Sequence, residues 1–150
     1  TAPAVIFIFP LMARPGLPFP KDWDEVDAED AGTAMACSFR DAYDVVRRAG
    51  IGEVFGLSGQ PPKDLADAAH RLALPFPLLS DPRLEFAFAL ALPRFLLHPE
   101  RYPAPAALVI QHGHLIAALH PVYEPGRAAT HLINRLAEAQ ARQLEKAHSA

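Results

Sequence analysis

Short runs of apolar residues alternate along the chain with segments in which apolar residues recur at helical spacing. The first run, residues 5–9, is five consecutive apolar residues rich in β-branched and aromatic types. Such a run is typical of a strand that is buried on both faces, as in the middle of a parallel or mixed sheet. Similar runs predict further strands, the last two joined by a tight turn at His112-Gly113. These strands are expected at residues 53–58, 76–79, 106–111 and 114–120.

The longest helical pattern begins after an irregular segment at residues 11–31. Thr33 is placed to cap a helix that runs to about Ala49, and Gly50 is placed to end it. The apolar positions of this helix should face the core. They are Met35, Phe39, Ala42 and Val46. Further helices are expected at residues 62–73, 82–92 and 126–146.

The order of these elements is β-α-β-α-β-α-β-β-α. Strands that alternate with helices indicate parallel pairing, and the late hairpin adds an antiparallel edge. This is the order of a thioredoxin-like fold, an α/β architecture with a mixed central sheet flanked by helices. The chain has 150 residues, a length typical of one domain, so we expect residues 1–150 to form a single domain.

Composition narrows the possible environments and partners. Hydrophobic residues make up 51% of the chain and charged residues 21%, which is typical of a compact soluble protein. The formal net charge of −3 gives no reason to expect nucleic acid or an anionic membrane as a partner. The single cysteine excludes a disulfide within the chain and favours a cytoplasmic location.

Two motifs carry a family resemblance. The first is the run Gly32-Thr33-Ala34-Met35-Ala36-Cys37-Ser38-Phe39-Arg40-Asp41. It resembles the active-site helix of Q-type (bacterioferritin-comigratory) peroxiredoxins of the AhpC/TSA family, which usually has Cys-Thr-x-x-x-Cys-x-Phe-Arg-Asp. The second is Leu74-Pro75-Phe76-Pro77-Leu78-Leu79-Ser80-Asp81, which is close to a hallmark of the same family. The resemblance covers nearly all of residues 4–136.

The resemblance implies a thioredoxin-like domain that reduces a peroxide substrate with a thiol reductant and without a cofactor. It places the peroxide-attacking cysteine of the family at Gly32 and the second cysteine at Cys37. Thr33 matches the threonine that follows the attacking cysteine. Pro105 stands where the family has an arginine, and Arg101 lies four residues earlier. The candidate catalytic residues are therefore Cys37, Thr33 and Arg101.

Two interpretations of Cys37 remain open. It could be the sole redox thiol of a one-cysteine peroxidase, since Arg40 and Arg48 could favour a thiolate. It could instead be inert, because the six carboxylates of residues 22–30 would disfavour a nearby anion and because it lies one turn too deep for the backbone anion site of the helix. The corresponding functions are a thiol peroxidase and a catalytically inactive peroxiredoxin-like module for binding or assembly.

Other polar clusters are weaker candidates. His112 and His114 are one residue apart at the hairpin turn, and His120 lies at the far end of the strand that begins at His114. Two ligands across a turn are too few for a closed metal site. We therefore expect no metal. The acidic stretch at residues 22–30 could bind a cation or a basic partner, although a charge run of this kind is more often a solvated loop.

Two features bear on protein partners. Trp23 lies inside the acidic stretch, where it either marks a contact surface or pins the loop onto the core. The chain begins at the first buried strand, without the N-terminal hairpin usual in the resembling family. The sheet edge near Val5 could then be covered by another subunit. The resemblance implies a homodimer, because peroxiredoxins often dimerise.

Overall fold

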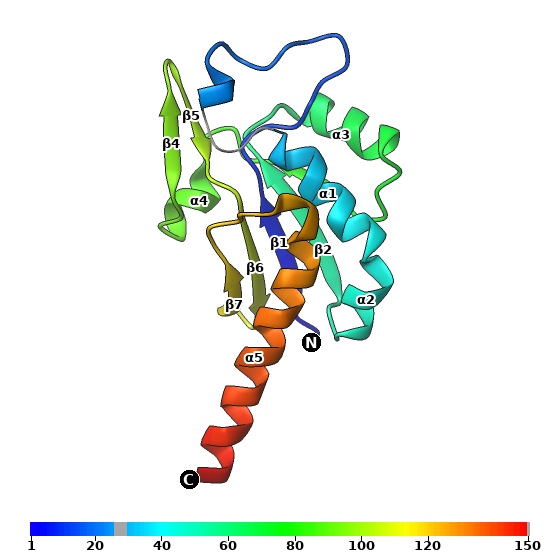
Figure 1. Ribbon diagram of the computed structural model, residues 1–150, viewed down its shortest axis with the longest axis vertical. Helices are drawn as coiled ribbons and strands as arrows, with labels where there is room; N and C mark the ends of the chain where they lie inside the picture. Colours follow the sequence, from blue (N-terminus) through cyan, green and yellow to red (C-terminus); the bar gives the residue numbers. More distant parts are fainter. Residues whose placement is uncertain (26–29, 150) are drawn as a thin grey trace.

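The central sheet has five strands in the order β3-β2-β1-β6-β7 (Figure 1). The structure, a computed structural model, describes residues 1–25 and 30–149. The strands are β1 (Ala4–Ile8), β2 (Glu53–Ser58), β3 (Leu78–Ser80), β6 (Ala106–Gln111) and β7 (His114–Leu119). β1 runs parallel to β2 and antiparallel to β6, and β2 runs parallel to β3. The predicted mixed central sheet is confirmed.

Helices cover both faces of this sheet. They are α1 (Ala31–Asp41), α2 (Tyr43–Arg48), α3 (Pro62–Arg71), α4 (Glu85–Ala89) and α5 (Ala128–Ser149). Val5 and Phe7 alternate with Ile8 across β1, as the two-residue period of a strand requires. Val5 and Phe7 belong to the main core with α1, α2, α3 and α5, whereas Ile8 belongs to a smaller core with Phe86 of α4. This layered arrangement is the predicted thioredoxin-like fold.

The position of β1 corrects one expectation. Val5 does not lie at a bare edge, because β1 pairs with β2 on one side and with β6 on the other. The edges of the central sheet are β3 and β7. A partner that covers a sheet edge would have to pair with one of these two strands.

The predicted helix at residues 33–49 is two helices, α1 and α2, separated at Ala42. The prediction that Thr33 caps the helix is wrong. Asp30 is the N-cap residue, and its side chain accepts a hydrogen bond from the Thr33 backbone N–H. Gly50 follows the end of α2 with a φ of +100°, a left-handed conformation that glycine adopts without steric cost.

The chain between α3 and β6 departs most from the prediction. The helix expected at residues 82–92 is confined to α4. It is followed by a two-stranded antiparallel ribbon, β4 (Arg94–Leu97) and β5 (Glu100–Pro103), which was not predicted. Figure 1 shows this ribbon beside the end of the central sheet.

Trp23 pins the loop that follows β1 onto the β4–β5 ribbon. It begins the short 3-10 helix η1 (Trp23–Glu25) and only 4% of its surface is exposed. Its ring centroid lies 5.1 Å from that of Tyr102 and 5.9 Å from that of Phe95, and the Phe19 ring stacks on it at 5.7 Å. Of the two interpretations of Trp23, the structure supports packing. Residues 26–29 of the acidic stretch lie outside the described residues.

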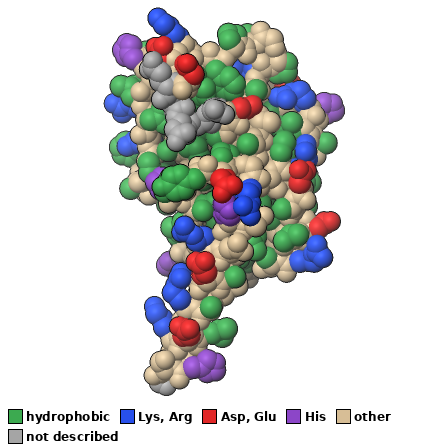
Figure 2. Space-filling view, viewed as in Figure 1, with side chains coloured by type: hydrophobic (Ala, Val, Ile, Leu, Met, Phe, Trp, Pro, Cys, Tyr) green, Lys and Arg blue, Asp and Glu red, His purple; other side chains and the backbone are tan. Residues whose placement is uncertain are grey.

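The last helix, α5, leaves the body of the protein partway along its length. It follows the 3-10 helix η2 (Pro125–Arg127), and its Leu132 and Leu136 are buried against the sheet. Leu144, expected on the apolar side, is 62% exposed. Figure 2 shows side chains of both charges along the projecting part. Among the described residues, no helix is long and apolar enough to cross a membrane.

Candidate functional site

Position 32 has no room for a side chain. Gly32 is the second residue of α1 and is buried. A Cβ atom at this position would lie 2.7 Å from the carbonyl oxygen of Leu11, 2.7 Å from the Phe9 ring and 3.0 Å from the Cβ of Met12. Interiors are close-packed, so such contacts can be relieved only if the backbone shifts. The place to which the resemblance assigns the peroxide-attacking cysteine is filled by the chain itself.

Hydrogen bonds hold the segment that fills this place. The Gln60 side chain is buried and binds both backbone groups of Met12, accepting from its N–H at 2.9 Å and donating to its carbonyl at 3.2 Å. The Phe9 N–H donates to the Leu57 carbonyl at 3.1 Å, which extends the pairing of β1 and β2 by one residue. The segment therefore cannot move away from α1 without breaking buried hydrogen bonds.

A carboxylate of the chain occupies the anion position at the start of α1. Asp30 Oδ1 accepts hydrogen bonds from the backbone N–H groups of Thr33 and Ala13, each at 3.2 Å. The first turn of a helix favours an anion because its N–H groups lack partners within the helix. In the resembling peroxiredoxins, the attacking thiolate is expected at this helix start. In this protein the Asp30 carboxylate occupies that position.

Thr33 lies next to this cap, at the third position of α1. Its backbone N–H is bound to Asp30, but its hydroxyl is buried and finds no hydrogen-bond partner among the described residues. The Thr33 hydroxyl therefore does not cap the helix, although the sequence predicted that it would.

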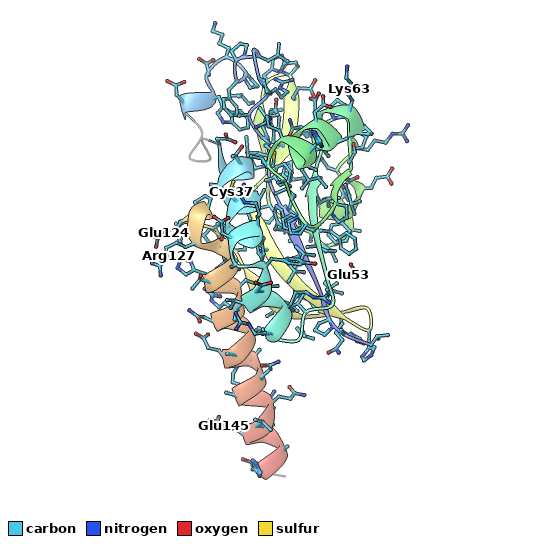
Figure 3. All side chains as sticks on the ribbon, turned by 90° about the vertical axis from the view of Figure 1, so that its right-hand side faces the viewer. Cys37, Glu53, Lys63, Glu124, Arg127 and Glu145 are labelled. Atoms are coloured by element: carbon cyan, nitrogen blue, oxygen red, sulfur yellow. The ribbon has the colours of Figure 1, made fainter. Side chains whose placement is uncertain are left out.

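Cys37 lies elsewhere on the same helix. It is the seventh residue of α1, beyond the first turn in which backbone N–H groups are free. Its side chain is half-buried, and Figure 3 shows it on the same side of the molecule as Glu124 and Arg127 around η2. The three atoms nearest to a Cβ at position 32 belong to Leu11, Phe9 and Met12, so Cys37 does not take part in this packing.

Arg40 is the cation beside Cys37, and it is already engaged. Its Nε donates to Asp41 Oδ1 at 2.9 Å and its Nη1 donates to the Leu72 carbonyl at 2.9 Å. The hydrogen bond to Asp41 is the main cause that raises the pKa of Arg40, and the negative charge of a Cys37 thiolate raises it further. The hydrogen bonds of Arg40 are thus made to the Leu72 carbonyl at the end of α3 and to the Asp41 carboxylate, and not to Cys37.

Arg101 lines a pocket that does not include Cys37. It is exposed on β5 and lines a pocket of about 350 Å³ at the carboxyl ends of β1 and β2. Leu11, whose carbonyl blocks position 32, lines the same pocket, but Thr33 and Cys37 do not. The other polar side chains of this pocket are Arg14, Gln60, Asp64, Glu100 and Tyr102. The three candidate residues are therefore not brought together into one site.

The motif residues that match the family have structural roles here. The Ser38 hydroxyl accepts a hydrogen bond from the Ala129 N–H in the first turn of α5, at 3.0 Å. Phe39 is fully buried, and its ring stacks on Phe7 with centroids 4.9 Å apart. Together with the bond from Arg40 to Leu72, these contacts tie α1 to α5, the sheet and α3.

The second motif is also explained by contacts within the fold. The Phe76 ring packs edge-on against Phe7 at 5.6 Å, and the Ser80 hydroxyl donates to the Gln60 carbonyl at 2.6 Å. Asp81 accepts hydrogen bonds from the backbone N–H groups of Glu85 and Phe86, both at 2.9 Å, and so supplies partners for the first two N–H groups of α4. The match to the family thus reflects the packing of the fold.

In the part of the chain that the structure describes, no three His, Cys, Asp or Glu side chains are grouped so that they could hold a metal ion. His112 in the β6–β7 turn, His114 at the start of β7 and His120 after β7 are all exposed.

The sequence matches the model of the AhpC/TSA family over residues 26–118. This match spans more than half of the chain. The chain belongs to the AhpC/TSA family. The match includes α1, which carries Gly32 and Cys37, the β4–β5 ribbon and most of the central sheet, but not β1 or the residues 9–12 that pack against position 32.

Curated relatives of this AhpC/TSA protein are plant proteins. Peroxiredoxin Q, chloroplastic, of Populus jackii is 35% identical over 79 residues, which is 53% of this chain and 30% of the relative. The protein of the same name from Gentiana triflora is 34% identical over 79 residues, 53% of this chain and 29% of the relative. The match thus spans less than a third of the length of these relatives.

Solved structures share the fold. Peroxidoxin BcpB from Mycobacterium tuberculosis superposes with a TM-score of 0.71 at 20% identity, covering 91% of this chain and 79% of that protein. The bacterioferritin comigratory protein of Xanthomonas campestris gives a TM-score of 0.68 at 18% identity, with 92% and 80% covered. These similarities confirm the peroxiredoxin-type fold.

Two residues of the site were missed in the sequence. The sequence prediction treats Asp30 only as part of the acidic stretch at residues 22–30, although an aspartate three residues before Thr33 is a typical N-cap signal. Gln60 gave no local signal, because its partner Met12 is 48 residues away in the chain. The first could have been found from spacing alone, and the second only from the fold.

Proposed function

We propose that this AhpC/TSA protein does not reduce peroxide at the usual family position and works as a peroxiredoxin-like module for binding or assembly. The observation that carries this proposal is the packing at Gly32. A Cβ there would lie 2.7 Å from a backbone oxygen, so the position has lost both its thiol and the space for one.

The other contacts support the same proposal. Asp30 holds the anion position at the start of α1, and a fixed carboxylate would repel a thiolate formed beside it. The family motif residues Ser38, Phe39 and Arg40 are used to join elements of the fold.

A thiol peroxidase that works through Cys37 is the second candidate. It is favoured by the half-buried sulfur beside Arg40 and by family membership. The bacterioferritin comigratory protein of Xanthomonas campestris, which shares the fold, has alkyl peroxide reduction activity. On this alternative a peroxide is the substrate and a small or protein thiol is the reductant, with Thr33 and Arg101 in supporting roles.

Consumption of peroxide separates the two candidates. The protein is mixed with hydrogen peroxide or an alkyl hydroperoxide and excess dithiothreitol, and its turnover is compared with that of Cys37→Ser. We expect equal rates that do not exceed the background of the reductant. Turnover that is present in the wild type and absent in Cys37→Ser would overturn the proposal and establish the peroxidase.

The remaining sequence predictions belong to this proposal. A cytoplasmic location rests on the single cysteine, while the plant relatives are named as chloroplastic proteins. A homodimer would have to use a surface other than the edge near Val5, and β3 and β7 are the free edges of the sheet. Sedimentation of the wild type tests the dimer directly.

A further inference from the structure

A second pocket, of about 370 Å³, lies between α4 and the β4–β5 ribbon. Three of its lining side chains are arginines: Arg83, Arg94 and Arg101. All three side chains are exposed, and none of their guanidinium groups forms a hydrogen bond or an ion pair with any residue that the structure describes. Glu100 is the one acidic side chain among the described lining residues.

The β4–β5 ribbon places Arg94 and Arg101 on one surface. Arg101 is paired with Leu96 in the register of the ribbon, and Arg94 lies two residues from Leu96 on the same strand. Since side chains alternate between the faces of a strand, Arg94, Leu96 and Arg101 share a face. The opposite face carries Phe95 and Tyr102, which pack on Trp23.

One of the arginines is held in place by an aromatic ring. The Arg94 guanidinium lies over the Phe88 ring of α4, 4.3 Å from its centroid. A cation over an aromatic face is attracted by the ring and loses little freedom when it binds a ligand. Arg94 is therefore oriented before any ligand arrives, while its N–H groups stay free.

The charge of this surface differs from that of the whole chain. The protein carries a formal net charge of −3, yet this pocket has three arginines and one glutamate. Unpaired cations that are close together repel one another, and an anion between them removes that repulsion. The guanidinium group also matches the planar forks of carboxylates and phosphates with two parallel hydrogen bonds.

We propose that Arg83, Arg94 and Arg101 form a binding site for a small, multiply charged oxyanion, the class that includes phosphates, pyrophosphates and polycarboxylates. Arg94 and Arg101 supply the guanidinium pair on the ribbon, and Arg83, two residues before α4, lines the same pocket. This anion site is independent of the proposed function, because it does not involve Cys37 or position 32.

The test is a calorimetric titration of the full chain with inorganic pyrophosphate and, separately, with citrate at constant ionic strength. Wild type is compared with the single variant Arg101→Gln and with the double variant Arg94→Gln/Arg101→Gln. The control is Arg142→Gln/Lys146→Gln on the projecting part of α5, which changes the net charge by the same amount. All four side chains are exposed, so we expect the variants to fold, and circular dichroism verifies this.

We expect saturable binding of at least one of the two probes by wild type and by the control. Binding should weaken about tenfold in Arg101→Gln, as expected for the loss of a charge-assisted contact, and further in the double variant. No saturable binding by wild type would overturn the proposal, as would an equal loss in the two double variants. An acidic peptide that binds this surface when neither probe does would also overturn it and identify a protein partner instead.

Discussion

At the scale of single residues, the surroundings of position 32 decide whether the family chemistry is available to this chain. A Cβ atom at position 32 would clash with the Leu11 carbonyl, the Phe9 ring and the Cβ of Met12, and the Gln60 side chain holds the Met12 backbone through two hydrogen bonds. A catalytic thiol in this family is expected to need an open pocket and the field of the helix start. In this protein the segment of residues 9–12 fills that space, and the Asp30 carboxylate accepts a hydrogen bond from the helix start.

A methyl group at position 32 should therefore destabilise the protein. Gly32→Ala places a Cβ against a backbone oxygen, and we expect it to lower the free energy of unfolding by about 1–3 kcal/mol, as overpacked cores do. The matched control is Gly126→Ala, because a Cβ at Gly126 would have no atom within 4 Å. Urea denaturation measures both, and the control should change by less than about 0.5 kcal/mol. Equal effects would show that position 32 has space.

Gly32→Cys carries the same Cβ and should not acquire peroxide reduction. Restoring the family cysteine supplies a sulfur but leaves the Leu11 carbonyl, Asp30 and Pro105 in place. We expect peroxide consumption equal to that of the wild type under the same reductant. A Gly32→Cys protein that turns over hydrogen peroxide would show that the site retains the rest of its apparatus.

At the scale of elements, α1 is the part that joins the others. Ser38 reaches α5, Arg40 reaches the residue that ends α3, and Phe39 packs on β1. The loop after β1 is fixed separately, by the packing of Trp23 on the β4–β5 ribbon. The same ribbon presents Arg94 and Arg101 on its other face, so it contributes to the stability of the loop and to the proposed anion site.

The bond between α1 and α5 can be measured through Ser38. In Ser38→Ala the Ala129 N–H at the start of α5 loses its acceptor, and we expect a loss of about 1 kcal/mol in the free energy of unfolding. Ser149→Ala removes a hydroxyl from the exposed end of the same helix and should change stability by less than about 0.5 kcal/mol. Chemical denaturation compares the two, and indistinguishable midpoints would mean that Ser38 does not anchor α5.

Tyr102 of the β4–β5 ribbon should make the free energy of unfolding depend on pH in the alkaline range. Burial raises the pKa of the Tyr102 phenol above its ordinary value of 10.0, Glu100 raises it further and Arg14 lowers it in part. As the pH rises, the phenol loses its proton in the unfolded chain before it does so in the folded protein. Its contribution to the free energy of unfolding is therefore fully present below the pKa of the unfolded chain, and it is lost as the pH rises through the raised pKa of the folded protein. The free energy of unfolding should fall less steeply with pH in Tyr102→Phe than in wild type.

The control for this pH dependence is Tyr123→Phe. Tyr123 is 83% exposed, so removing its hydroxyl should leave the alkaline fall in stability as in wild type. Urea midpoints on either side of the ordinary tyrosine pKa are sufficient for the comparison. If the free energy of unfolding falls equally steeply with pH in Tyr102→Phe and in wild type, folding does not raise the pKa of the Tyr102 phenol.

At the scale of the whole molecule, local patterns predicted the elements that have a clear period. β2 and the β6–β7 hairpin lie at the expected residues, because each is an uninterrupted strand bounded by turn residues. The β4–β5 ribbon was missed since its strands have four residues each and lie among prolines. The central position of β1 depends on its pairing with β6, about 100 residues later, and no local pattern carries that information.

The site was predicted less completely than the fold. The motif showed that Gly32 stands in place of a cysteine, but not that Leu11 and Phe9 fill the space. It also placed Cys37, Thr33 and Arg101 together as candidates, whereas Arg101 lies in a pocket that the other two do not line. Long-range contacts decided each of these points.

The most direct test of the central claim is the rate at which Cys37 reacts with hydrogen peroxide. Sulfenic acid is followed by mass spectrometry under pseudo-first-order conditions, with free cysteine as the reference and Cys37→Ser as the blank. The thiolate attacks peroxide, and a site that activates it raises the rate by orders of magnitude. We predict a second-order rate constant of the same order as that of free cysteine. A rate constant orders of magnitude higher would contradict the inactive-module proposal and assign Cys37 the role of a peroxide-reducing thiol.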